Sequence, residues 1–108
     1  MTTKYTGSGN YQPIKDRPDK YISRWGTPNN QQTRTSKSIA IAKHPITEWA
    51  KDLHKLAKQQ GTPQETEHIW TLIQTIDGLP DFQAGTNTYR IDIDNLQLHA
   101  QASITRLP

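Results

Sequence analysis

The residues with the widest chemical scope in this chain are its histidines and a pair of nearby aspartates. No two histidines have the HxxxH or HExxH spacing that binds zinc; the four are His44, His54, His68 and His99. Asp92 and Asp94 are two residues apart, and paired carboxylates can serve in acid–base or metal chemistry. We expect Asp92 on the solvent side of a strand and Asp94 in a turn. These residues therefore predict neither a metal site nor a catalytic pair.

Nucleophilic and cofactor motifs are also missing from the sequence. It contains no GxSxG or SxxK pattern, and Gly7-Ser8-Gly9 is followed by Gln12 where a dinucleotide-binding loop needs glycine. The absence of cysteine excludes disulfides, thiolate catalysis and cysteine-ligated clusters. We therefore predict a protein that is not an enzyme and that carries no cofactor. A small enzyme whose site is assembled only in three dimensions stays open as a third alternative.

The main functional signal is the uneven charge of the chain. Residues 1–37 contain seven basic and two acidic residues, a sum of +5, whereas residues 38–108 contain six basic and eight acidic residues, a sum of −2. A basic segment ahead of a weakly acidic body indicates an anionic partner. Aromatic rings stand directly beside cations in this segment. The candidate binding residues are Lys4, Tyr5, Tyr11, Lys15, Arg17, Lys20, Tyr21, Arg24, Trp25, Arg34 and Lys37.

This mixture of residues favours two functions. Lysine and arginine neutralise phosphates while tyrosine and tryptophan stack on unpaired bases, which predicts a basic arm that contacts nucleic acid or a nucleoprotein complex. The same residue types are preferred in protein interfaces. The alternative is therefore a protein-binding inhibitor, immunity or assembly accessory of a mobile element. A further interpretation has Tyr21, Ile22 and Trp25 packed into the domain's own core.

Two helices are indicated in the middle of the chain. Apolar residues follow Pro45 at helical spacing, which predicts a first helix over about 45–60 that Gly61 ends. Thr62-Pro63-Gln64-Glu65 has the pattern of a capping box, with proline at the first helical position. A second helix is therefore expected to end near residue 77, before Gly78 and Pro80. The short connection between the helices predicts an αα-hairpin.

Alternation with a period of two appears on both sides of the helices. Residues 38–43 alternate over a short stretch and predict a strand. Near the C-terminus, Tyr89, Ile91 and Ile93 alternate with polar residues, and a second alternating run begins at Leu96. A two-residue Asp94-Asn95 turn would place Ile93 opposite Leu96. We expect an α+β domain in β-α-α-β-β order, with a small antiparallel sheet and the helix pair on its apolar face.

Composition sets the remaining expectations. With 108 residues the chain has the size of one domain, which we place at 38–108, behind an extended and partly disordered arm at 1–37. The sequence has no apolar run that would cross a membrane and no signal peptide, so we expect a cytoplasmic protein with no membrane partner. The small core favours a monomer or a weak homodimer.

Overall fold

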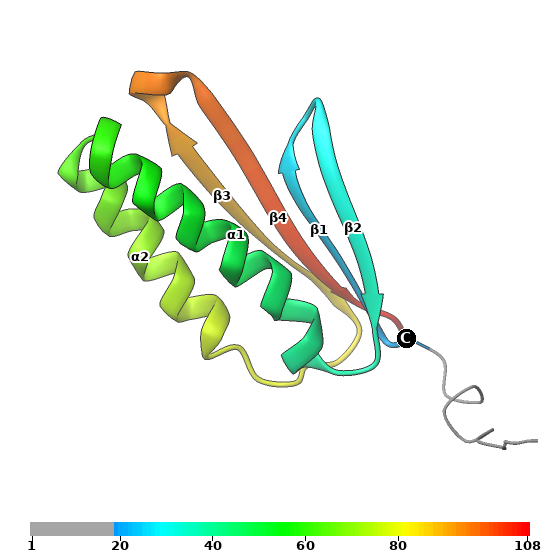
Figure 1. Cartoon of the computed structure of the whole chain (residues 1–108). Helices are drawn as coiled ribbons and strands as arrows, with labels where there is room; N and C mark the ends of the chain where they lie inside the picture. The colour runs from blue at the N-terminus through cyan, green and yellow to red at the C-terminus, as the bar shows by residue number, and fades with distance from the viewer. Residues whose placement is uncertain (1–18) are drawn as a thin grey trace, which may run out of the picture.

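The computed structural model describes residues 19–108, which form one antiparallel sheet with two helices on one face (Figure 1). The fold class is therefore α+β, as predicted, with strands before and after an αα-hairpin. The strand order across the sheet is β2-β1-β4-β3. The elements are β1 (Tyr21–Thr27), β2 (Asn30–Ser36), α1 (Ile39–Gln60), α2 (Pro63–Asp77), β3 (Gly85–Ile93) and β4 (Leu98–Arg106).

The described part of the expected arm is not irregular chain. Residues 21–36 form a β-hairpin, and β1 lies between β2 and β4 in the middle of the sheet. Pro28 and Asn29 make its turn, and Gly26 has a φ of +127°, a conformation that favours glycine. Residues 1–18 of the expected arm lie outside the described residues. The hairpin from 21 to 36 is thus an integral part of the domain.

The strand expected over residues 38–43 is wrong, because α1 already begins at Ile39. Ser38 caps the helix, its side-chain oxygen accepting a hydrogen bond from the Ile41 amide. Ile39, Ala42 and Ile46 continue the buried face of the helix at a spacing of three and four residues. Pro45 therefore lies inside α1, where it removes a hydrogen bond to the carbonyl of the exposed Ile41.

The second helix agrees with its sequence signals. It covers Pro63–Asp77, Thr62 is its N-cap, and the capping box is complete. The Thr62 hydroxyl accepts from the Glu65 amide at 3.2 Å, and the Glu65 carboxylate accepts from the Thr62 amide at 2.9 Å. Both of these amides would otherwise lack a partner at the start of the helix.

The C-terminal hairpin forms as expected, but its register differs by two residues. Ile93 pairs with Leu98 rather than Leu96, because a 3₁₀ turn at Asp94–Leu96 and a left-handed Gln97 replace the two-residue turn. A shift of two residues keeps every side chain on its expected face. Ile91 and Ile93 accordingly remain in the core.

The core lies between the helix pair and the covered face of the sheet. Its largest fully buried side chains are isoleucines from both helices and from β3 and β4, namely Ile46, Ile69, Ile76, Ile91, Ile93 and Ile104. Tyr21 belongs to it as well, with 3% of its surface exposed. Among residues 19–108 no helix is long and apolar enough to cross a membrane.

Candidate functional site

Three cations meet in a hollow at the end of the sheet where the described chain begins. The hollow has a volume of about 340 Å³, and we call it the basic hollow. It forms there because the ends of β1, β2 and β4 meet the loop that follows α2 (Figure 1). Its lining contains a single carboxylate, that of Asp81; the residues are Lys20, Tyr21, Lys37, Ser38, Asp81, Phe82, Gln83 and Arg106. The hollow therefore carries a positive charge.

Lys37 is the one cation of the hollow with a described carboxylate partner. Its ammonium nitrogen lies 3.2 Å from Asp19, and both side chains are exposed. Hydrogen bonds from Thr35 and then from Lys37 hold the pKa of Asp19 below its usual value. Asp19 thus stays ionised near neutral pH, and an exposed pair of this kind remains open to exchange with another anion.

Arg106 is held in place by neutral groups. Its guanidinium lies 5.3 Å from the centre of the Tyr21 ring and donates to the Leu107 carbonyl at 2.8 Å. The Tyr21 hydroxyl reaches the Asp81 carboxylate at 3.4 Å. Among the described residues neither Arg106 nor Lys20 forms an ion pair. Two cations therefore face the hollow without an ion-pair partner among residues 19–108, and Asp81 is the one carboxylate in its lining.

The structure separates the described candidate residues of the arm into four places. Lys20 and Lys37 meet at the basic hollow. Tyr21 is buried and Trp25 is half-buried against the core, so neither offers a free face to a base. Arg24 lies on the uncovered face of the sheet, and Arg34 is exposed on the helix side of β2. The candidates outside the described residues are Lys4, Tyr5, Tyr11, Lys15 and Arg17.

Sequence reasoning missed Arg106. It is separated from Lys20 by most of the chain, and the two meet because Tyr21 pairs with Arg106 in the register of β1 and β4. No local pattern marks this residue. Only the placement of β1 in the middle of the sheet would have predicted the contact.

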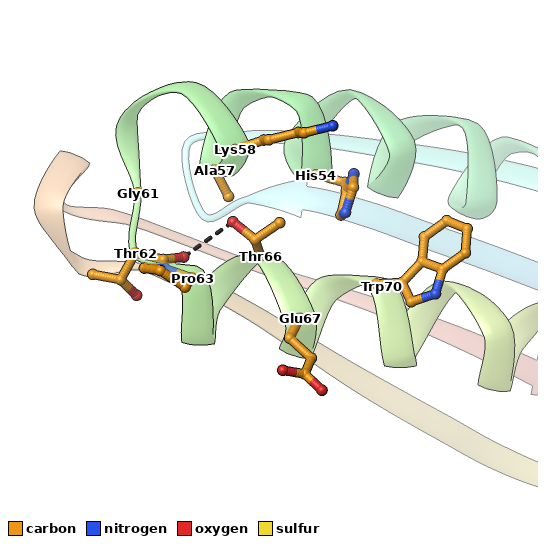
Figure 2. Close-up of a pocket in the computed structure, with 9 residues that line it drawn as sticks. All are labelled: His54, Ala57, Lys58, Gly61, Thr62, Pro63, Thr66, Glu67 and Trp70. Atoms are coloured by element: carbon orange, nitrogen blue, oxygen red, sulfur yellow. Dashed lines mark hydrogen bonds between the residues drawn. The ribbon is translucent and has the colours of Figure 1, made fainter.

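A second cavity of about 570 Å³ lies between the two helices, where α1 ends and α2 begins. Trp70 stands at its edge with 48% of its surface exposed, and Figure 2 shows it facing His54. The centres of these two rings are 5.5 Å apart. Lys58 and Glu67 place opposite charges on the rim. We call this cavity the helix-pair cleft.

The other histidines and carboxylates do not converge. His99 lies 3.1 Å from Asp92, which also contacts Arg90 at 3.6 Å, all on the uncovered face of the sheet. Among residues 19–108 no three histidine or acidic side chains are grouped so that they could hold a metal ion. The ion pairs of Asp92 are exposed and contribute little to stability.

Comparison with known proteins gives no further direction, because no protein family, curated protein or solved structure matches this chain. The geometry and charge of these surfaces therefore carry the functional assignment.

Proposed function

We propose that this protein is a binding protein without catalytic activity, whose basic N-terminal segment and basic hollow together contact the phosphates of a nucleic acid. The observation that carries the proposal is the convergence of Lys20, Lys37 and Arg106 on one hollow beside residue 19. Residues 1–18 carry three more cations, Lys4, Lys15 and Arg17, and enter the domain at this point. Six cations are thus available to a nucleic acid, although Asp16 and Asp19 alternate with Lys15, Arg17 and Lys20 in this stretch of the chain.

The start of α1 supports the same proposal. The helix has 22 residues, its first turn contains no acidic residue, and its N-cap Ser38 lines the hollow. The positive end of the helix dipole adds to the field of the three cations. Phosphates are attracted by such a combination of side-chain and backbone charge.

Salt-dependent binding tests the proposal. We expect full-length protein to bind labelled DNA or RNA with a log–log salt slope of roughly −3 to −5, because four to six phosphate contacts contribute about 0.7 to 0.9 each. Fluorescence anisotropy between about 50 and 200 mM salt measures this slope. Binding weaker than about 100 μM at the low-salt end would reject the proposal, since even non-specific DNA binders usually exceed that affinity.

A pair of double variants separates the basic hollow from net charge alone. Lys20→Gln with Lys37→Gln removes two cations from the hollow, and we expect the slope to flatten by about 1.4 to 1.8. Lys51→Gln with Lys55→Gln removes the same charge from the exposed face of α1 and should change the slope much less. Equal effects would assign the binding to overall charge and overturn the role of the hollow.

The helix-pair cleft favours a second candidate function, that of a protein-binding accessory. An exposed tryptophan beside a cavity with charges on its rim has the composition of an interface hot spot. Capture of a protein from source lysate that survives nuclease treatment, and that is lost in Trp70→Ala, would support this function. Capture that nuclease abolishes would favour the nucleic acid.

A further inference from the structure

The two outer edges of the sheet are protected to different degrees. At the β3 edge, α2 reaches over the strand: the His68 ring nitrogen Nε2 lies 3.4 Å from the Arg90 carbonyl oxygen. The Glu65 carboxylate accepts from the Asp94 amide, directly after β3, at 2.8 Å. Side chains of α2 therefore satisfy two backbone groups at the C-terminal end of this edge, which makes the addition of another strand there unfavourable.

The hydrogen-bonding pattern of β1 identifies the outward groups of β2. The Leu107 amide donates to the Lys20 carbonyl, whereas the Lys20 amide donates to the Ser36 carbonyl of β2. From Ile22 onward, every second residue of β1 therefore bonds to β4. The residues between them, beginning with Tyr21, bond to β2. Their partners are every second residue of β2 from Ser36 to Asn30, and the amides and carbonyls of these partners point toward β1. The residues of β2 whose amide and carbonyl both point away from the sheet are Gln31, Thr33 and Thr35.

No side chain among residues 19–108 is hydrogen-bonded to these outward groups. β2 also lacks the usual protections of an edge strand, because Asn30–Ser36 contains no proline and no lysine, and pairs with β1 in continuous register without a bulge. Arg34 is its one charged residue. The described structure thus leaves a regular, seven-residue strand with a free edge.

The surroundings of this edge are basic. Residues 19–37 contain four cations, Lys20, Arg24, Arg34 and Lys37, and one acidic residue, Asp19, which pairs with Lys37. The side chain of Ile41 on α1 is an apolar group on the same side. Lys43 bonds to the carbonyls of Asp77 and Leu79, so it faces α2. Ile41 is two residues earlier, roughly 200° around the helix from Lys43, and therefore faces the β2 side. Ile41 is 46% exposed.

We infer that the β2 edge accepts an extended segment of a partner protein as an additional strand, and that this segment is acidic with at least one apolar residue. Backbone hydrogen bonds to Gln31, Thr33 and Thr35 supply the pairing, as in other complexes formed by strand addition. Carboxylates complement the cations of residues 20–37, and the apolar residue packs on Ile41. A second copy of this basic hairpin is disfavoured here by the repulsion of like charges.

The test uses full-length protein and a short labelled peptide of alternating glutamate and valine, with its lysine–valine counterpart as control. We expect the acidic peptide to bind at least tenfold more tightly than the basic one by fluorescence anisotropy. Amide hydrogen exchange should slow at Gln31, Thr33 and Thr35 when the acidic peptide is saturating. No binding, or equal binding of both peptides, would overturn the inference.

Matched proline variants locate the binding edge. Thr33 and Thr88 stand at the two ends of one cross-strand row, which runs through Arg24 and Ser103, so the same substitution removes an outward amide from either edge. Thr33→Pro should weaken the peptide at least fivefold, and Thr88→Pro less than twofold. Equal weakening by both variants, or by neither, contradicts the assignment to β2.

A charge variant keeps the inference testable if Thr33→Pro does not fold. Arg34→Glu should weaken the acidic peptide and tighten the basic one, since Arg34 is exposed beside the free edge. Unchanged preference would overturn the role of charge. Protein that forms dimers and binds neither peptide would instead show that a second copy occupies the edge. Lys20 and Lys37 also line the basic hollow, whereas Thr33 and Arg34 do not, so the variants at Thr33 and Arg34 separate strand addition from binding at the hollow.

Discussion

The two hairpins of the sheet are built from different kinds of residue. In the β3–β4 hairpin, buried isoleucines alternate with polar residues, and both strands contribute to the core. In the β1–β2 hairpin only β1 does so, through Tyr21 and the half-buried Trp25, while β2 buries nothing except Ser36. β2 is therefore held mainly by backbone pairing with β1, whereas both strands of the β3–β4 hairpin are also held by side-chain packing.

The difference shows that one sheet can combine a strand that stabilises the fold with a strand that leaves its surface free. β2 has six exposed residues out of seven, so their identities are largely independent of the core. The β3 edge is tied to α2 by His68 and Glu65. We therefore expect substitutions in the two hairpins to have unequal effects on stability.

The largest expected difference comes from a charge placed in each hairpin. Ile91→Asp puts a carboxylate at a position that is 1% exposed and should lower the free energy of unfolding by more than about 4 kcal/mol, a large fraction of the roughly 5–15 kcal/mol that stabilises a typical domain. Thr33→Asp places the same group on the exposed β2 and should cost about 1 kcal/mol or less. Urea unfolding followed by circular dichroism measures both. A similar loss in the two variants would show that β2 is packed like β3.

The same contrast explains which elements could be predicted from the sequence. The β3–β4 alternation and the Thr62–Glu65 capping box each reflect a local physical requirement, so the sequence predicted both correctly. Only the register of the β3–β4 hairpin differs from the prediction, because of its turn geometry. β2 has no apolar residue, and β1 carries Ile22 and Trp25 on opposite faces, so no period of two marks them. The signal that was available is the turn sequence Pro28-Asn29 between threonine-rich stretches.

The candidate site was predictable only in part, for a related reason. The charge asymmetry identified Lys20 and Lys37 but gave no indication that they would lie in one hollow. Their third partner, Arg106, comes from the other end of the chain through strand pairing. Tyr21 was predicted both as a binding candidate and as a residue packed in the core, and it is a core residue. Both predictions were open because sequence alone does not distinguish an aromatic ring that binds from one that packs.

A second comparison between the hairpins uses their glycines. Gly26 has a φ of +127°, and a Cβ there would lie 2.2 Å from the Asn30 carbonyl oxygen. Gly26→Ala should therefore cost about 2 to 3 kcal/mol, through backbone strain and the displacement of the hairpin turn. Gly85, at the start of β3, has a φ of +140° but open space around its Cβ position, so Gly85→Ala should cost about 1 kcal/mol.

Thermal unfolding of the two alanine variants provides the measurement. The expected order, with Gly26→Ala less stable than Gly85→Ala, would confirm that the β1–β2 turn needs glycine for steric reasons as well as for its conformation. The reverse order would mean that the turn can relax around an added methyl group. In that case the close approach to Asn30 does not restrict the hairpin.

The smallest expected effect concerns the hydrogen bond between Glu65 of α2 and the Asp94 amide at the end of β3, which has no counterpart in the β1–β2 hairpin among residues 19–108. Backbone hydrogen bonds from Thr62 and then from Asp94 hold the pKa of Glu65 below its ordinary value of 4.5. A carboxyl group whose pKa is lowered by folding stabilises the folded state at pH values above its unfolded pKa. This contribution is lost as the pH falls through the lower, folded pKa. The protein should therefore lose stability in acid, in part through Glu65.

Glu65→Gln tests this sign directly. The amide retains one acceptor oxygen for the capping box but has no charge to titrate, so the variant should be less stable at pH 7 and should lose less stability on acidification than the parent. Glu67→Gln, on the same helix and exposed, should retain the acid sensitivity of the parent. Urea unfolding between about pH 3 and 7 compares the three proteins, and amide exchange at Asp94 should be faster in Glu65→Gln alone. An unaltered pH profile in Glu65→Gln would mean that the contacts of this carboxylate to Thr62 and Asp94 do not stabilise the protein in solution, which would leave His68 as the side chain of α2 that protects the β3 edge.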